Sequence, residues 1–168
     1  MEHKTHNGHY LKLFFMVFLS FISMYILMYS MVYSVKDVYP NINQFYMAAL
    51  MSMPMLVIEL ALMGRMYPNK KLNIILISIG LIGMVVFFLF IQFQTALSDK
   101  QFLKGMIPHH SAAILMSEKF KSRDTAIQKL QQEIIFSQKK EIEIMKNKLK
   151  ELKSTRFYSV PEPKVQKN

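Results

Sequence analysis

Three long apolar stretches with almost no charge constrain this chain more than any other feature of its sequence. Residues 13–35 and 72–93 contain no charged side chain, and residues 45–64 contain only Glu59, together with Pro54. About 20 apolar residues in a helix span the roughly 30 Å hydrocarbon core of a bilayer, where each backbone group must find its hydrogen bond within the protein. We therefore predict three transmembrane helices in residues 13–97, preceded by a His-containing tail at residues 1–12.

Charge is concentrated after these stretches. Six of the 21 Lys and Arg residues and three of the 11 acidic residues precede residue 98, so fifteen and eight follow, a net of +7. The N-terminus and second loop carry five Lys and Arg residues, against three in the first loop and the twenty residues after the third span. This count favours a multi-pass protein with a cytoplasmic N-terminus and an extracytoplasmic C-terminal region.

The basic residues lie along predicted helices without interleaved aromatic residues, so we expect a lipid bilayer as partner and no nucleic acid. The chain has no cysteine, which excludes disulfides and thiolate metal sites.

Residues 98–153 have the sequence pattern of a helical hairpin. Ser98 followed by Gln101 predicts a capping box and a helix to about Lys121. A turn at residues 122–124 would lead into a second helix to about Lys153, and the Pro-containing residues 154–168 are expected to be a disordered tail. The predicted fold is all-α: three transmembrane helices followed by a two-helix antiparallel hairpin, which would form a ferritin-like four-helix bundle if it dimerises.

Polar side chains interrupt the apolar stripe of each hairpin helix. At 100° per residue, one stripe of the first helix centres on His109, and the facing stripe of the second helix includes Gln138 and Glu141. Folding the hairpin brings these interruptions to one level, with methionines close by. Imidazole and thioether together suit copper, whereas no HExxH pattern supports a zinc hydrolase. Alternatively, His109 bonds Glu141 or Gln138 and only sets the helix register.

These residues carry a family resemblance. The run from Asp99 to His110, then Met116, then Gln138 to Met145, resembles domain-of-unknown-function family 305. Members of that family are ferritin-like and often exported, and some bind copper through Met and His. The resemblance covers about residues 98–150 and implies Met106, His109, His110, Met116 and Met145 as ligands. With the residue-based reasoning, the candidate metal ligands are Met106, His109, His110, Met116, Gln138, Glu141 and Met145, with Asp99 as a weaker candidate.

Two other features are weaker metal candidates. The second apolar stretch repeats Met47, Met51, Met55, Glu59 and Met63 at fourfold spacing. A carboxylate inside the membrane suggests function, but plain helix packing or pairing of Glu59 with Arg65 explains it too. The N-terminus holds His3, His6 and His9, which could bind a divalent metal or simply belong to a disordered tail.

The sequence thus predicts a non-enzymatic, membrane-anchored binding protein for a soft metal, copper or silver, in metal homeostasis or resistance. Its ligand would be a metal ion rather than an organic substrate, and we expect a homodimer or a higher homo-oligomer. One alternative is a membrane scaffold or oligomerisation module without metal; another is a metal-dependent membrane oxidoreductase.

Overall fold

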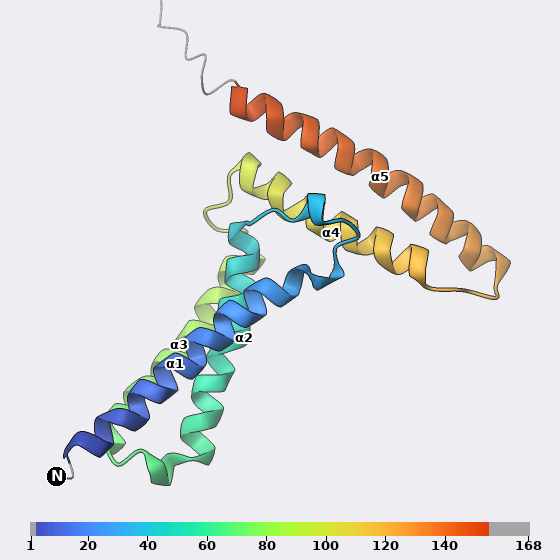
Figure 1. Cartoon of the computed structure of the whole chain (residues 1–168). Coiled ribbons are helices and arrows are strands. Elements are labelled where there is room, and N and C mark those ends of the chain that lie inside the picture. Colours follow the sequence, from blue (N-terminus) through green and yellow to red (C-terminus); the bar gives the residue numbers. More distant parts are fainter. Residues whose placement is uncertain (1–2, 155–168) are drawn as a thin grey trace, which may run out of the picture.

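The structure, a computed structural model that describes residues 3–154, contains five α-helices and no strand in that range. The elements are α1 (His3–Leu27), η1 (Met28–Met31), η2 (Val35–Asp37), α2 (Ile42–Leu62), η3 (Gly64–Met66), α3 (Lys70–Gln92), α4 (Asp99–Lys119) and α5 (Thr125–Ser154). The first three α-helices run side by side, and the hairpin of α4 and α5 lies across the end of this group that is remote from the N-terminus (Figure 1). The predicted all-α fold is confirmed.

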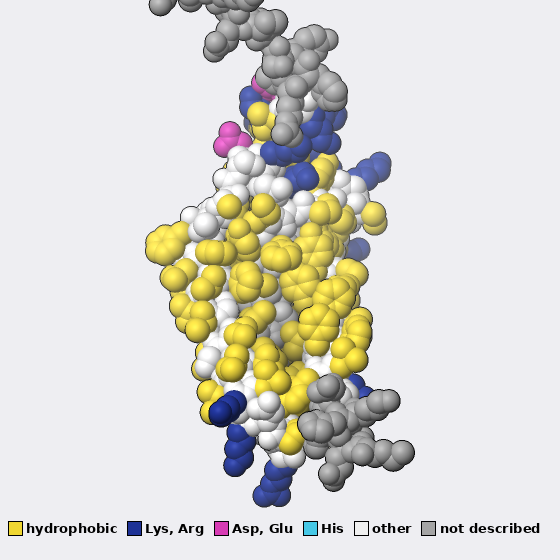
Figure 2. Space-filling view, turned by 90° about the vertical axis from the view of Figure 1, so that its left-hand side faces the viewer, with side chains coloured by type: hydrophobic (Ala, Val, Ile, Leu, Met, Phe, Trp, Pro, Cys, Tyr) yellow, Lys and Arg dark blue, Asp and Glu magenta, His cyan; other side chains and the backbone are white. Residues whose placement is uncertain are grey.

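Three helices are long and apolar enough to cross a membrane: Gly8–Met31, Ile42–Leu62 and Lys70–Gln92, with mean hydropathies of 2.1, 1.8 and 3.1. Figure 2 shows hydrophobic side chains forming a broad band, with Lys and Arg gathered towards its two ends. Because most of these apolar side chains are exposed in the isolated chain, the band is suited to contact with lipid.

The first span begins and ends earlier than predicted. Residues 3–12 are not a separate tail but continue α1, and α1 gives way to η1 before residue 35. The Tyr10 hydroxyl donates to Asn73 Oδ1 at 2.7 Å, which ties this early turn of α1 to α3. At the other end, Tyr33, within the predicted span, and Asp37, just after it, make hydrogen bonds to the hairpin. The predicted tail after Ser154 lies outside the described residues.

Small residues allow α2 and α3 to approach closely. A Cβ atom at Gly80 would lie 2.6 Å from Val57 Cγ2, and one at Gly83 would lie 3.0 Å from Met53 Sδ. Such contacts between small residues and neighbouring side chains are the usual basis of helix packing in membranes, where apolar burial gives little driving force.

The turn from α3 to α4 is a C-terminal helix cap. Thr95 N–H donates to Phe90 O at 3.0 Å and Gln94 N–H donates to Ile91 O at 3.3 Å. Gln94 takes the left-handed conformation, with φ 49°, at the position where glycine is usual. Ser98 then caps α4 by accepting from Gln101 N–H, as predicted. The Gln101 side chain, however, accepts from Ile42 N–H at the start of α2 instead of completing a capping box.

Helix α4 is covered on two sides. On one side Ile107 and Ile114 pack with Ile142, Met145 and Leu149 of α5. On the other side α4 contacts η1, η2 and the start of α2. The hairpin is therefore attached to the membrane helices rather than held out in water.

Pro108 creates one of the attachments. A proline has no N–H, so its position in α4 leaves the carbonyl of Lys104 without its usual helical partner. Asn41, which caps α2, donates to this carbonyl through Nδ2 at 3.5 Å. Together with the bond from Ile42 to Gln101, this contact joins the beginnings of α2 and α4.

Asp37 makes a further attachment, through a buried charge. Its carboxylate is only 5 % exposed, accepts from Ser111 Oγ of α4 at 2.6 Å and pairs with Lys146 Nζ of α5 at 2.5 Å. Ser111 Oγ in turn accepts from Tyr33 N–H at 2.9 Å. A buried carboxylate needs such partners to offset its lost hydration.

Lys146→Met should therefore weaken the docking of the hairpin, because it leaves the Asp37 carboxylate buried without a counter-charge. We expect a loss on the order of 3 kcal/mol in the free energy of unfolding of the detergent-solubilised protein. Lys148→Met is the matched control, since Lys148 pairs with Glu151 on the exposed side of α5, and it should change stability by less than about 0.5 kcal/mol. Equal losses in the two variants would contradict the role of Asp37.

Candidate metal site

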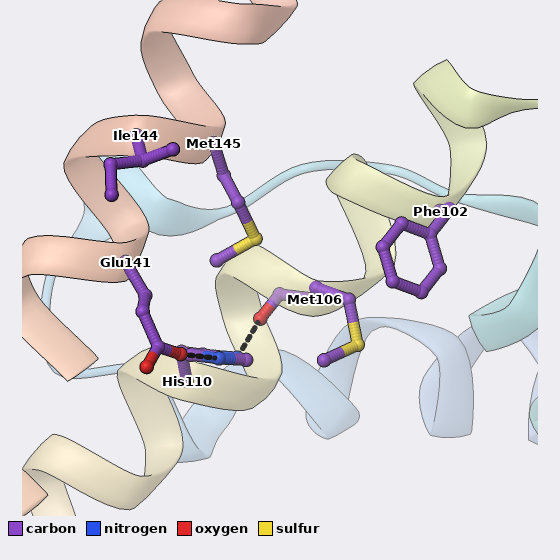
Figure 3. A pocket seen from close by; sticks show the side chains of 6 residues that line it. All are labelled: Phe102, Met106, His110, Glu141, Ile144 and Met145. Atoms are coloured by element: carbon purple, nitrogen blue, oxygen red, sulfur yellow. Dashed lines mark hydrogen bonds and ion pairs between the residues drawn. The ribbon is translucent and has the colours of Figure 1, made fainter. Parts of the chain in front are cut away.

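A cavity of about 230 Å³ lies between α4 and α5. Its wall contains an imidazole, a carboxylate and two thioethers along with two apolar side chains. The lining residues are Phe102, Met106, His110, Glu141, Ile144 and Met145. Figure 3 shows His110 and Glu141 facing each other across the hairpin, with Met145 descending from α5 towards the same space.

His110 is held in one orientation by both ring nitrogens. The side chain is 11 % exposed, Nδ1 lies 2.9 Å from Met106 O, and Nε2 lies 2.7 Å from Glu141 Oε2. Because a carbonyl oxygen can only accept, Nδ1 must carry a proton, and Nε2 is the nitrogen that can offer a lone pair. A histidine whose Nδ1–H donates to a backbone carbonyl is the usual arrangement for a metal ligand that binds through Nε2.

Glu141 supplies the negative charge of the cavity. Its side chain is 49 % exposed, so it can move away from His110 without leaving a buried charge. When Nε2 carries a proton, the two groups form an ion pair. When that proton leaves, both Nε2 and the carboxylate become available as donors to a cation.

The two methionines place soft donors on both helices. Met145 is buried and Met106 is half-buried, and both belong to or pack against the core between α4 and α5. The cavity therefore combines one nitrogen, one carboxylate and two thioether sulfurs. Among the described residues, no group of three or more His, Asp and Glu side chains comes together. The donors of this cavity are mixed: two soft thioethers, one imidazole and one carboxylate.

The structure brings together four of the seven main candidate ligands and separates the other three. Met106, His110, Glu141 and Met145 share the cavity, whereas His109, Met116 and Gln138 do not line it. His109 is exposed, and Met116 is 53 % exposed. The buried face of α4 centres on Ile107, His110, Ser111 and Ile114. This face is rotated about the helix axis by about one residue position from the predicted stripe, which centres on His109. Asp99 is exposed at the first turn of α4.

The rotation of α4 has a physical cause. The predicted stripe of α4 follows the largest apolar side chains, as if α5 were the only element packed against this helix. In the structure the first loop covers another side of α4, and Phe102 and Phe120 remain 50 % and 64 % exposed. The helix register also differs, because the connection occupies residues 120–124. Glu141 therefore faces His110 rather than His109.

Glu59 finds its partner in Tyr67 rather than Arg65. The Tyr67 hydroxyl donates to Glu59 Oε1 at 3.1 Å. Burial raises the pKa of Tyr67 above its ordinary value, and the hydrogen bond to Glu59 adds to the shift, so the phenol stays a donor. In the methionine stripe Met51 and Met63 are exposed and Met55 is half-buried, while Met47 lines a different cavity.

The three N-terminal histidines all lie in α1. The ring of His9 meets Tyr67 edge-on, with centroids 6.4 Å apart. The side chains of His3 and His6 lie outside the part of the structure in which side chains are described.

Sequence reasoning missed the residues that fix the site in place. Asp37, Ser111 and Lys146 come from three separate segments, and no periodicity links them. The one available signal was Asp37 itself, which is the only acidic residue in the short loop between the first two spans.

Taken together, the fold and the site define a small all-α protein with three candidate membrane helices and a helical hairpin that carries a His, Glu and Met cavity. Residues 91–154 match the family described as a domain of unknown function, DUF305. The chain is also 39 % identical over 122 residues to an uncharacterized protein of Acanthamoeba polyphaga mimivirus, covering 71 % of this chain and 78 % of that protein. The chain belongs to the DUF305 family.

The similarity to the viral protein is not confined to the hairpin. An alignment of 122 residues is longer than the whole chain from residue 91 onward, so it must extend into the candidate membrane helices. No solved structure matches the chain.

Proposed function

We propose that this protein is a membrane-anchored, non-enzymatic binding protein for a soft transition-metal ion, copper as Cu(I) or else silver, in metal homeostasis or resistance. The observation that carries the proposal is the shared cavity of Met106, His110, Glu141 and Met145. Thioether sulfur selects soft ions such as Cu(I), and imidazole suits copper. The metal is the cargo of the protein.

The pair of His110 and Glu141 suits reversible binding. A cation at Nε2 would replace the proton that joins this nitrogen to Glu141, while Met106 O keeps the ring in position through Nδ1. Metal binding would then displace this proton from the nitrogen. The partly exposed carboxylate can remain beside the ion and neutralise its single charge.

One rival proposal has a specific observation in its favour. His110 and Glu141 already satisfy each other at 2.7 Å, so the pair could serve only to fix the register of α4 and α5 in a scaffold. A structural pair would not need thioethers beside it. Replacement of a methionine by leucine separates the two roles, because leucine keeps the apolar volume and removes the sulfur. A metal-dependent oxidoreductase lacks a comparable observation in its favour.

Cu(I) titration of the full-length, detergent-solubilised protein against a chromogenic Cu(I) chelator tests the proposal. The wild type should compete with the chelator. His110→Ala and Met145→Leu should each lower the affinity for one equivalent of Cu(I) by tenfold or more, because each variant loses a ligand. Met116→Leu is the control, since Met116 is exposed on α4 outside the cavity, and it should bind as the wild type does. Unchanged binding in both cavity variants would leave only the structural role.

We further propose that the N-terminus is cytoplasmic and the hairpin extracytoplasmic. The N-terminus and the loop containing η3 lie at one end of the three helices, and the first loop and hairpin lie at the other (Figure 1). The end proposed to be cytoplasmic carries five Lys and Arg residues. A reporter active only outside the cytoplasm, fused after Lys153, should give signal. A silent fusion, together with an active cytoplasmic reporter at the same point, would reverse the orientation.

We also propose that the protein forms a homodimer through its hairpins. The first loop covers part of α4, yet Ile127, Leu130 and Phe136 of α5 remain exposed beyond the three candidate spans, as do Phe102 and Phe120 of α4. A second copy related by a twofold axis would bury such side chains, each worth roughly 1.5–3 kcal/mol. Native mass spectrometry in detergent should give twice the chain mass. Phe136→Ser should shift the protein towards monomer, whereas a monomeric wild type would exclude the bundle.

A further inference from the structure

A second cavity, of about 280 Å³, lies between α4, the end of the first candidate span and the beginning of α2. It is distinct from the cavity of His110, because it faces η1 and α2 instead of α5. Three methionine side chains and one histidine line it: Met28, Met31, Met47 and His109. We refer to this cavity as the junction cavity.

Three separate segments bring these donors together. Met28 and Met31 begin and end η1, and side chains three residues apart lie on one side of a 3₁₀-helix. Met47 comes from the first turns of α2, and His109 comes from the middle of α4. Met28 and Met47 are half-buried and Met31 is 47 % exposed, so the cavity is open to an arriving ion.

The donors of the junction cavity are not engaged elsewhere. Within the described part of the chain, neither ring nitrogen of the exposed His109 makes a hydrogen bond with the protein, and its one aromatic ring pair is with His110. The Oδ1 atom of Asn43, in the same wall, is buried without a hydrogen-bond partner. An unpaired buried acceptor is costly and calls for an explanation. In metal sites the histidine nitrogen that does not bind the ion donates to just such an oxygen.

We propose that the junction cavity is a second site for a soft monovalent cation, Cu(I), with Met28, Met31, Met47 and His109 as its ligands. No carboxylate lines this cavity, so the donor set is neutral and favours a singly charged, soft ion over Zn²⁺ or Cu(II). The proposal rests on the proposed function for the choice of metal, but it uses none of the ligands of the first site.

The two sites would lie on two different faces of α4. His109 and His110 are consecutive, and successive side chains of a helix point about 100° apart. Their ring centroids are 6.2 Å apart, yet one ring lines the junction cavity and the other lines the cavity against α5. The double histidine would thus serve two ions, one at the end of the membrane helices and one within the hairpin.

The number of Cu(I) ions bound by the full-length protein in detergent tests this proposal, with Cu(I) itself as the probe and a chromogenic chelator as competitor. The wild type should bind two equivalents. The variant His110→Ala/Met145→Leu should keep one, and the variant Met28→Leu/Met31→Leu/His109→Ala should keep the other, each losing at least tenfold in affinity at the altered site. Met116→Leu, which touches neither cavity, should bind two.

X-ray absorption of Cu(I) in the His110→Ala/Met145→Leu variant gives a second measurement that leaves the junction cavity unaltered. It should show sulfur together with nitrogen as ligands. If that variant binds no Cu(I) while the wild type binds one equivalent, the junction site is refuted and the proposed function stands. If the junction variant still binds two equivalents, the junction site is also refuted. A wild type that binds no Cu(I) would refute both proposals.

Discussion

The buried carboxylate of Asp37 is the contact on which the arrangement of this protein depends. A charged group with 5 % exposure is tolerated only while its partners stay in place. Those partners are Ser111 of α4 and Lys146 of α5, so one loop residue fixes both helices of the hairpin. Tyr33, in the same loop, also contacts both hairpin helices. Its hydroxyl donates to Glu118 of α4, and its ring centroid lies 5.6 Å from Lys139 Nζ of α5.

This attachment determines which faces of α4 are available for chemistry. If the hairpin were free in water, α4 would have only one packed side, and a single polar stripe would suffice for it. Because the first loop and α2 cover another side, consecutive residues of α4 can meet two different environments. His110 meets Glu141 and two thioethers, while His109 meets the methionines of η1 and α2.

The sequence was sufficient to predict the elements but not their rotation about their own axes. Length and apolarity predicted the three spans, and Ser98 and the turn expected at residues 122–124 predicted the hairpin, because these signals are local. Rotation depends on what covers each helix. The helical stripe favoured His109, because large apolar side chains flank it in the sequence. In the structure the first loop covers part of α4, and His110 faces α5. No local sequence pattern indicates that Asp37 forms a hydrogen bond with Ser111, which lies 74 positions away.

The same reasoning explains why the chemistry of the chain sits where membrane helices and hairpin meet. In the membrane part the possible ligands are weakly assembled: Glu59 is satisfied by Tyr67, and Met51 and Met63 point outward. Pro108 prevents one helical hydrogen bond in α4 and thereby recruits Asn41, which holds α2 against the turn that carries His109 and His110. A proline that would simply weaken an isolated helix here joins the two halves of the protein. It does so within two residues of both histidines, and Asn41 and Pro108 themselves line the cavity that contains His109.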